Sequence, residues 1–148
     1  MATAALRRVL PERAAADGIT LGIAGGCMAP AIRDGARVRV AAQRFYWPSA
    51  VLVFFAADGR LTAHRLIDAG PPRWRFRVFT RADNARALDP AIPLCDVVGR
   101  VVGGECAAEI VRVPSPQRGR APACFARAAA AWALGLHRAT PTPSTRDG

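Results

Sequence analysis

The chain has 148 residues, about half of them apolar, and a formal net charge of +10 at pH 7. A chain of this length can bury about two-thirds of its unfolded surface in one core, so no second domain is needed. All 21 basic residues are arginine. Because they are spread along the chain and not gathered into one run, we do not expect a nucleic acid as the partner. The charge could equally attract an acidic leader peptide or a negatively charged membrane surface.

Residues 1–18 form a short, charged, alanine-rich N-terminal segment. This segment has neither the apolar core of a secretory signal nor the apolar length of a membrane span. The four cysteines, at positions 27, 95, 106 and 124, include no Cys-x-x-Cys pair, which suits a reducing compartment and predicts no metal site. We therefore expect a cytoplasmic protein, either soluble or in peripheral contact with the inner face of the membrane.

Residues 25–30, Gly-Gly-Cys-Met-Ala-Pro, predict a tight turn that carries a cysteine. Two glycines before Cys27 allow backbone N–H groups to face outward, as an oxyanion site requires. A thiolate is a strong nucleophile, and an adjacent imidazole can generate it from a thiol. The alternative is an inert cysteine, since cysteine often behaves as a small buried apolar residue.

Alternation of arginine with apolar residues predicts half-exposed strands over residues 36–40, 74–79 and 110–113. Between them, Ala-Asp-Gly at 57–59 predicts a hairpin turn, and Ala-Gly-Pro-Pro at 69–72 predicts another chain reversal. We therefore expect residues 19–113 to form a mainly β domain with an antiparallel or mixed sheet.

His64 lies within the apolar-alternating run 61–67, on the return strand of the predicted hairpin. A strand would hold the imidazole rigidly and could bring it back across the fold toward Cys27. The alternative is a structural histidine without a chemical role.

The last segments differ from the rest in composition. Residues 114–122 are rich in proline, arginine and glycine and predict a linker. Residues 123–138 predict an amphipathic helix, because apolar residues recur at steps of three and four, namely Phe125, Ala129, Trp132 and Leu136. This helix either packs on the sheet or docks on a membrane surface or a partner protein, and it is too short to span a bilayer. Residues 139–148 are polar and are expected to be disordered.

Several short motifs follow one another in a distinctive order. They are Gly-x-Cys-Met-x-Pro at 25–30, Ile-Arg-Asp-Gly at 32–35, Tyr46, Val-Leu-Val-Phe at 51–54, His-Arg at 64–65, Asp83-Asn84 with Asp89, and Val-Gly-Arg-Val at 98–101. This order, which covers most of residues 19–102, resembles the type I signal peptidase family. The resemblance implies the β-rich catalytic fold that this family shares with the self-cleaving repressor peptidases, here followed by the C-terminal helix.

The resemblance assigns a nucleophile and a base. The nucleophile box of the family reads Ser-Met-x-Pro, so Cys27 stands where the serine would be. One branch of the family uses a lysine base and the other a histidine. This chain has no lysine, and arginine does not lose its proton in proteins, so His64 takes the base role of the histidine branch.

Two aspartates six residues apart complete this pattern. We favour Asp89 as the carboxylate that orients His64, with Asp83 shaping the turn or assisting. The alternative is that Asp83-Asn84 is only a turn signal and Asp89 a cap before Pro90.

The resemblance also suggests where the oxyanion and the substrate lie. The Cys27 N–H would bind the oxyanion together with an amide of Gly25 or Gly26, a choice that the sequence leaves open. Met28 and Pro30 complete the nucleophile box and are assigned to the same oxyanion and substrate-binding region.

The chain departs from the family pattern at several structural positions: it has Asp-Gly-Ala at 34–36 for Asp-Gly-Asp, Ser-Ala at 49–50 for Gly-Asp, and Arg-Ala-Asp at 81–83 for Lys-Gly-Asp. Most of these lie outside the proposed triad. We therefore expect a cysteine endopeptidase without metal or cofactor, which cleaves a peptide or protein precursor, such as a ribosomally made one, after small residues. The alternative is a catalytically inactive peptide-binding module that holds an extended chain at a sheet edge.

Overall fold

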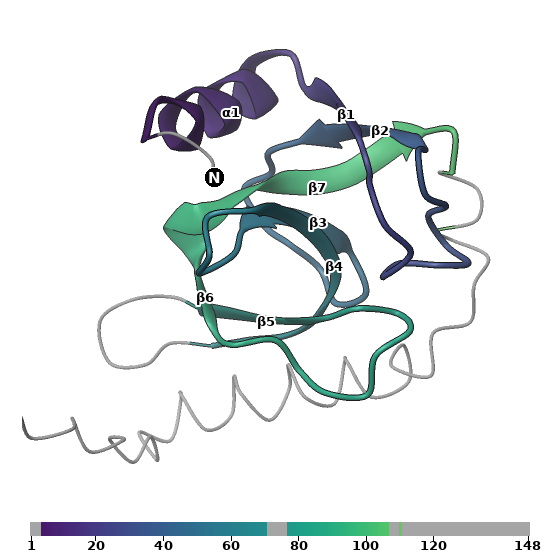
Figure 1. Cartoon of the computed structure of the whole chain (residues 1–148). Coiled ribbons are helices and arrows are strands. Elements are labelled where there is room, and N and C mark those ends of the chain that lie inside the picture. Colours follow the sequence, from purple (N-terminus) through teal and green to yellow (C-terminus); the bar gives the residue numbers. More distant parts are fainter. Residues whose placement is uncertain (1–3, 71–76, 107–109, 111–148) are drawn as a thin grey trace, which may run out of the picture.

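The computed structural model describes residues 4–70, 77–106 and 110. In this part of the chain seven antiparallel strands form one sheet that curls into a half-barrel, accompanied by one α-helix (Figure 1). The elements are α1 (Ala4–Ala16), β1 (Ile19–Gly22), β2 (Arg37–Ala41), β3 (Val51–Phe55), β4 (Leu61–Gly70), β5 (Arg77–Arg81), β6 (Ile92–Pro93), the 3₁₀ turn η1 (Leu94–Asp96) and β7 (Val97–Gly104). The prediction of a mainly β fold is therefore confirmed.

The strands follow the order β1-β2-β7-β3-β4-β5-β6 across the sheet. Three shifts of register interrupt the ladders, between Arg39 and Val40, between Val53 and Phe54, and between Leu66 and Asp68. Such irregularities bend a strand and increase its local twist. They help the sheet to curl, so that β4 and β1 border one cavity although four strand pairings separate them.

The hairpin predicted at residues 57–59 is present and joins β3 to β4. The amide of Gly59 donates to the carbonyl of Ala56 at 2.8 Å, and the Ala56 amide donates to the carbonyl of Arg60 at 2.9 Å. Gly59 has a φ of 80°, a conformation that glycine adopts without a steric penalty. The turn fixes the register in which His64 lies opposite Leu52 of β3.

The predicted alternation is borne out in β2, one residue later than expected. Arg37 and Arg39 are exposed, whereas Val38 and Val40 are fully buried. In the predicted strand 74–79, residues 77–79 belong to β5, and residues 74–76 lie outside the described residues.

The strand predicted at residues 110–113 is wrong at its first residue. The Ile110 amide donates to the carbonyl of Cys106 at 3.0 Å, which is a helical i to i−4 contact. The rest of this segment lies outside the described residues. So do the predicted linker at 114–122, the helix at 123–138 and the tail at 139–148.

The core has two parts, on opposite faces of β3, where all five residues are buried. Val51, Val53 and Phe55 join the first part, which includes Met28, Val38 and Val98. Leu52 and Phe54 join the second part, which includes Leu66, Val78 and Ile92. A strand with both faces buried is held firmly, and its partner β4 carries His64.

The N-terminal segment, for which we predicted no element, is the helix α1. Alanine is frequent in it, and alanine has the highest helix propensity. Ala14 is buried against the first core part, and Arg7 pairs with Asp96 at 2.7 Å while its guanidinium lies over the ring of Phe55. No helix in the described part of the chain is long and apolar enough to cross a membrane.

Candidate active site

His64 is held by a carboxylate, and that carboxylate is held in turn by a hydroxyl. Nδ1 of His64 lies 2.6 Å from Oδ2 of Asp89, and Oγ1 of Thr80 donates to the same oxygen at 2.5 Å. The Asp89 amide also donates to the carbonyl of Thr80 at 2.9 Å. The side chains of His64 and Asp89 are 13% and 24% exposed. A carboxylate only accepts hydrogen bonds, so Nδ1 carries the proton and Nε2 is the free nitrogen.

The rings of His64 and Phe54 form a T-shaped contact, with the centroids 6.0 Å apart. Phe54 is buried in β3, next to β4 in the sheet. The imidazole is therefore fixed by packing on one side and by Asp89 on the other.

Cys27 lies in the turn between β1 and β2 and is partly buried. The turn is tied to the loop of residues 82–91, which we call the β5–β6 loop. The Asn84 side-chain amide donates to the carbonyl of Gly26 at 2.9 Å, and the Asn84 backbone amide lies 3.4 Å from the carbonyl of Cys27. The β5–β6 loop therefore holds both the cysteine turn, through Asn84, and the histidine, through Asp89.

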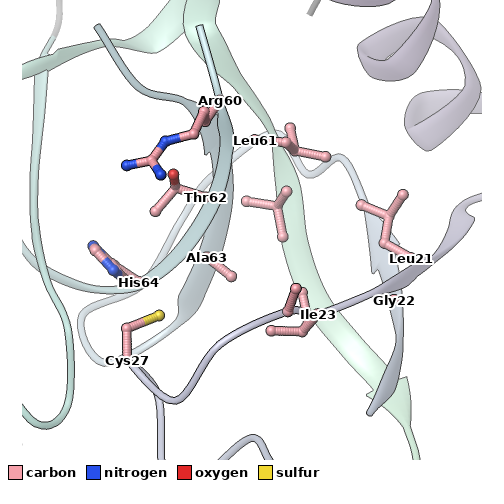
Figure 2. A pocket seen from close by; sticks show the side chains of 11 residues that line it. Leu21, Gly22, Ile23, Cys27, Arg60, Leu61, Thr62, Ala63 and His64 are labelled. Atoms are coloured by element: carbon pink, nitrogen blue, oxygen red, sulfur yellow. The ribbon is translucent and has the colours of Figure 1, made fainter. Parts of the chain in front are cut away.

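Cys27 and His64 line the same cavity of about 480 Å³ (Figure 2). The two side chains lie beside each other in this view, at the end of the cavity away from Leu61. Most of the remaining wall is apolar and comes from Leu21, Ile23, Ala24, Val53, Leu61 and Ala63. A nucleophile and a base thus line one cavity, whose largely apolar wall excludes much of the solvent around an apolar ligand.

The second predicted aspartate does not lie on the histidine. Asp83 accepts two hydrogen bonds from Arg65, from Nε at 2.7 Å and from a terminal nitrogen at 2.6 Å. Arg65 also donates to the carbonyl of Ser49 at 2.8 Å. The side chains of Arg65 and Asp83 are 0% and 6% exposed, so this is a buried, bidentate ion pair. Asp83 orders the β5–β6 loop, which agrees with the turn-shaping role and not with a direct contact to His64.

Three assignments to the oxyanion and substrate region need correction. The Gly25 amide donates to Oδ1 of Asp34 at 2.7 Å, so it is already used within the turn and the amides of Gly26 and Cys27 are the better oxyanion candidates. Met28 is fully buried in the first core part and anchors the turn to the core. Pro30 is exposed and follows a cis peptide bond, but it does not line the cavity.

The roles of Thr80 and Asn84 in supporting the site were not predicted from the sequence. The signal for Thr80 was available: the alternation that buries Val78 continues to residue 80, where a polar side chain then faces the interior and needs a hydrogen-bond partner. The role of Asn84 carried no such signal, because its partners lie 57 and 58 positions away in the chain.

No protein-family model matches the chain, and no curated protein matches it either. Among the described residues, no group of three or more His, Cys, Asp and Glu side chains is arranged to hold a metal ion. The cavity and the residues that line and support it are the structural basis for a function.

Proposed function

We propose that the chain is an endopeptidase of the signal-peptidase type in which Cys27 is the nucleophile, His64 the general base and Asp89 the residue that orients the base. One observation carries this proposal: Asp89 holds Nδ1 of His64, and the same imidazole lines a cavity together with the Cys27 thiol. A thiol, an imidazole and a carboxylate in this relation form the constellation of covalent acyl-transfer enzymes.

The order of the site residues along the half-barrel is the motif order that carries the resemblance, and the family assignment is part of the proposal. The nucleophile turn comes before β2, the histidine lies on the return strand of a hairpin, and the aspartate follows β5. These are the positions in which the motifs of the family occur in the sequence. We infer a cytoplasmic enzyme whose substrate is a peptide or protein precursor.

The reaction begins with proton transfer from the Cys27 thiol to Nε2 of His64. The thiolate attacks the scissile carbonyl, and a carbon–sulfur bond forms while the oxygen becomes an oxyanion. The amides of Cys27 and Gly26 donate to this oxyanion. The carbon–nitrogen bond then breaks as the imidazolium returns its proton to the leaving amine.

The resulting thioester is hydrolysed by water. His64 removes a proton from the water, which adds to the thioester carbonyl, and Cys27 leaves as the thiolate and is reprotonated. Asp89 stabilises the imidazolium in both halves of the reaction without taking its proton. Thr80 keeps the Asp89 carboxylate in the orientation that favours this contact.

The substrate enters as an extended chain between β1 and β4. β1 pairs with β2 on one side and is the terminal strand of the sheet, so its other edge can pair with the backbone of a peptide. Leu21, Ile23 and Leu61 give this path apolar walls, and the resemblance implies small side chains beside the cysteine.

The test is the reactivity of Cys27 toward iodoacetamide between pH 5 and 9, mapped by peptide mass spectrometry in the native protein and in His64→Ala. The exposed Cys95 is the internal control. We expect Cys27 to react at least about tenfold faster than Cys95 near pH 7 and to lose this advantage without His64. Equal rates for the two cysteines, or no effect of His64→Ala on Cys27, would refute the mechanism.

A digest of a peptide library then tests cleavage itself. Cys27→Ala should abolish cleavage and Cys27→Ser should retain part of it, because a serine with a histidine base is the arrangement of the histidine branch. A full set of cleavages by Cys27→Ala would end the proposal. Peptide binding without cleavage by the native protein would favour the binding module instead.

A further inference from the structure

The cavity carries a positive charge at some distance from Cys27. Arg60 is the one residue among those that line the cavity in the described structure whose side chain has a permanent charge. Its guanidinium lies beyond Thr62 as seen from His64 (Figure 2). Thr62 and His64 project from the same side of β4, and Arg60, which directly precedes this strand, lies on that side too (Figure 2), so the arginine and the imidazole face one path.

The distance between these groups follows from strand geometry. Arg60 directly precedes β4 and is four residues from His64, which corresponds to at most about 13 Å along the direction of the strand. An extended peptide beside β4 rises by the same amount per residue. A carboxylate three or four residues from the scissile bond can therefore reach the guanidinium.

Arg60 is available to a ligand because its present partner holds it weakly. Nε of Arg60 lies 2.7 Å from Oδ2 of Asp58, and the two side chains are 80% and 52% exposed. Exposed pairs of this kind contribute little, since water and salt screen them. The Arg60 backbone amide also donates to Oδ1 of Asp58 at 3.0 Å, so the aspartate is anchored to the turn and the arginine side chain can exchange it for another carboxylate.

We infer that the cavity selects peptides with an acidic side chain three or four residues from the scissile bond, which pairs with Arg60 while an apolar side chain occupies the wall between Leu21 and Leu61. This inference rests on the proposed function for the position of the scissile bond. The preference for an acidic ligand does not rest on the proposed function, because it depends only on Arg60 and on the apolar, otherwise uncharged lining of the cavity.

The experiment uses Cys27 as the attachment point for a pair of matched probes. N-(5-carboxypentyl)maleimide ends in a carboxylate, and 6-maleimidohexanamide ends in a neutral amide. The rate of Cys27 labelling with each probe is measured by peptide mass spectrometry. The rate with the carboxylate probe is divided by the rate with the amide probe, and this quotient is divided by the same quotient for Cys95 to give the corrected ratio. We expect a corrected ratio of about three in the native protein, falling toward one in Arg60→Gln and in 1 M NaCl.

Two further variants sharpen the test. Asp58→Asn removes the competing charge but keeps the Oδ1 acceptor for the turn, so the corrected ratio should rise. Arg8→Gln is the matched control, because Arg8 is also exposed and paired with a nearby acid, Glu12, but lies on α1. It should leave the ratio unchanged.

A corrected ratio near one in the native protein, an unchanged ratio in Arg60→Gln, or no labelling of Cys27 by either probe would each overturn the inference. The proposed mechanism is tested separately, by the effect of His64→Ala on the rate at which the neutral probe labels Cys27. Loss of the charge preference with intact dependence on His64 would refute only the acidic specificity. A charge preference that persists while Cys27 labelling does not depend on His64 would refute only the peptidase mechanism.

Discussion

Asp83 and Asp89 bind neighbouring residues of one strand: Asp83 accepts both its hydrogen bonds from Arg65, and Asp89 accepts one from His64. Because consecutive side chains of a strand point to opposite faces, two acids six residues apart serve different purposes. One neutralises a buried guanidinium, and the other orients an imidazole at the edge of a cavity.

Asn substitutions at the two aspartates should therefore separate stability from reactivity. Asp83→Asn leaves the Arg65 charge buried without its counter-charge, and we expect it to lower the free energy of unfolding by about 3 kcal/mol. Asp89→Asn should cost about 1 kcal/mol but should remove most of the His64-dependent reactivity of Cys27. Urea denaturation and iodoacetamide labelling measure the two effects. The distinction fails if Asp89→Asn is as destabilising as Asp83→Asn and leaves Cys27 equally reactive.

Thr80 is expected to act through Asp89. Thr80→Val preserves the shape of the side chain but removes the hydroxyl that donates to Oδ2 of Asp89. We predict a pH profile of Cys27 labelling that differs from that of the native protein, with a rate reduced about fivefold at pH 7. Thr80→Ser keeps the hydroxyl and should restore the native profile. A purely structural role would lower stability in Thr80→Val without changing the profile.

Gly99 in β7 has no room for a side chain. A Cβ at this position would lie 2.7 Å from the carbonyl carbon and oxygen of Ala41, whereas a Cβ at Gly103 would meet nothing closer than the Arg39 Cβ at 3.9 Å. Gly99→Ala forces backbone of β2 and β7 apart, and we expect a loss of about 2 kcal/mol in unfolding free energy. Gly103→Ala in the same strand is the control and should change stability by less than about 0.5 kcal/mol. Equal effects would contradict the close approach of the two strands.

The contribution of Asp68 to the free energy of unfolding should be less favourable at neutral pH than at low pH. Burial raises the pKa of Asp68 above its ordinary value, and the hydrogen bond from the Ala69 amide only partly opposes this effect. The folded state thus binds the carboxyl proton more tightly than the unfolded state. Stability contributed by this group is present below the unfolded pKa and is lost as the pH rises through the folded pKa.

Asp68→Asn is neutral at every pH and keeps an Oδ1 acceptor for the Ala69 amide. We expect it to raise the free energy of unfolding at pH 7 by less than about 1 kcal/mol, since solvent screens the partly exposed carboxylate. The gain should disappear near pH 3. Urea denaturation of both proteins across this pH range measures it, and a gain that grows toward low pH would contradict the direction of the pKa shift.

The strand over residues 37–40 and the hairpin at residues 57–59 could be predicted because their signals are local. Alternation of arginine and valine over residues 37–40 needs only a sheet with one buried face, and Asp58-Gly59 needs only a turn that requires glycine. The position of β1 opposite β4 across one cavity was not predictable in this way, since it depends on how far the sheet curls.

The errors at the cysteine turn have the same origin. The sequence predicts an outward-facing turn with free amides, but Met28 is a core residue and Asp34 occupies the Gly25 amide. Both contacts depend on the path of the chain between β1 and β2. Helix α1 was missed because Pro11 and scattered charges obscure its periodicity, and Ala14 is its single buried residue.

The β5–β6 loop couples the two halves of the candidate site, namely the cysteine turn and the histidine with its aspartate. The Asn84 amide reaches the Cys27 carbonyl and the Asp89 amide reaches the Thr80 carbonyl, so both bonds break when this loop leaves the sheet. A single local opening would then disorder the thiol and the imidazole together, and hydrogen exchange at both amides would report one opening free energy. The reactive arrangement would exist either complete or not at all, which protects the thiol from chemistry that a half-assembled site could permit.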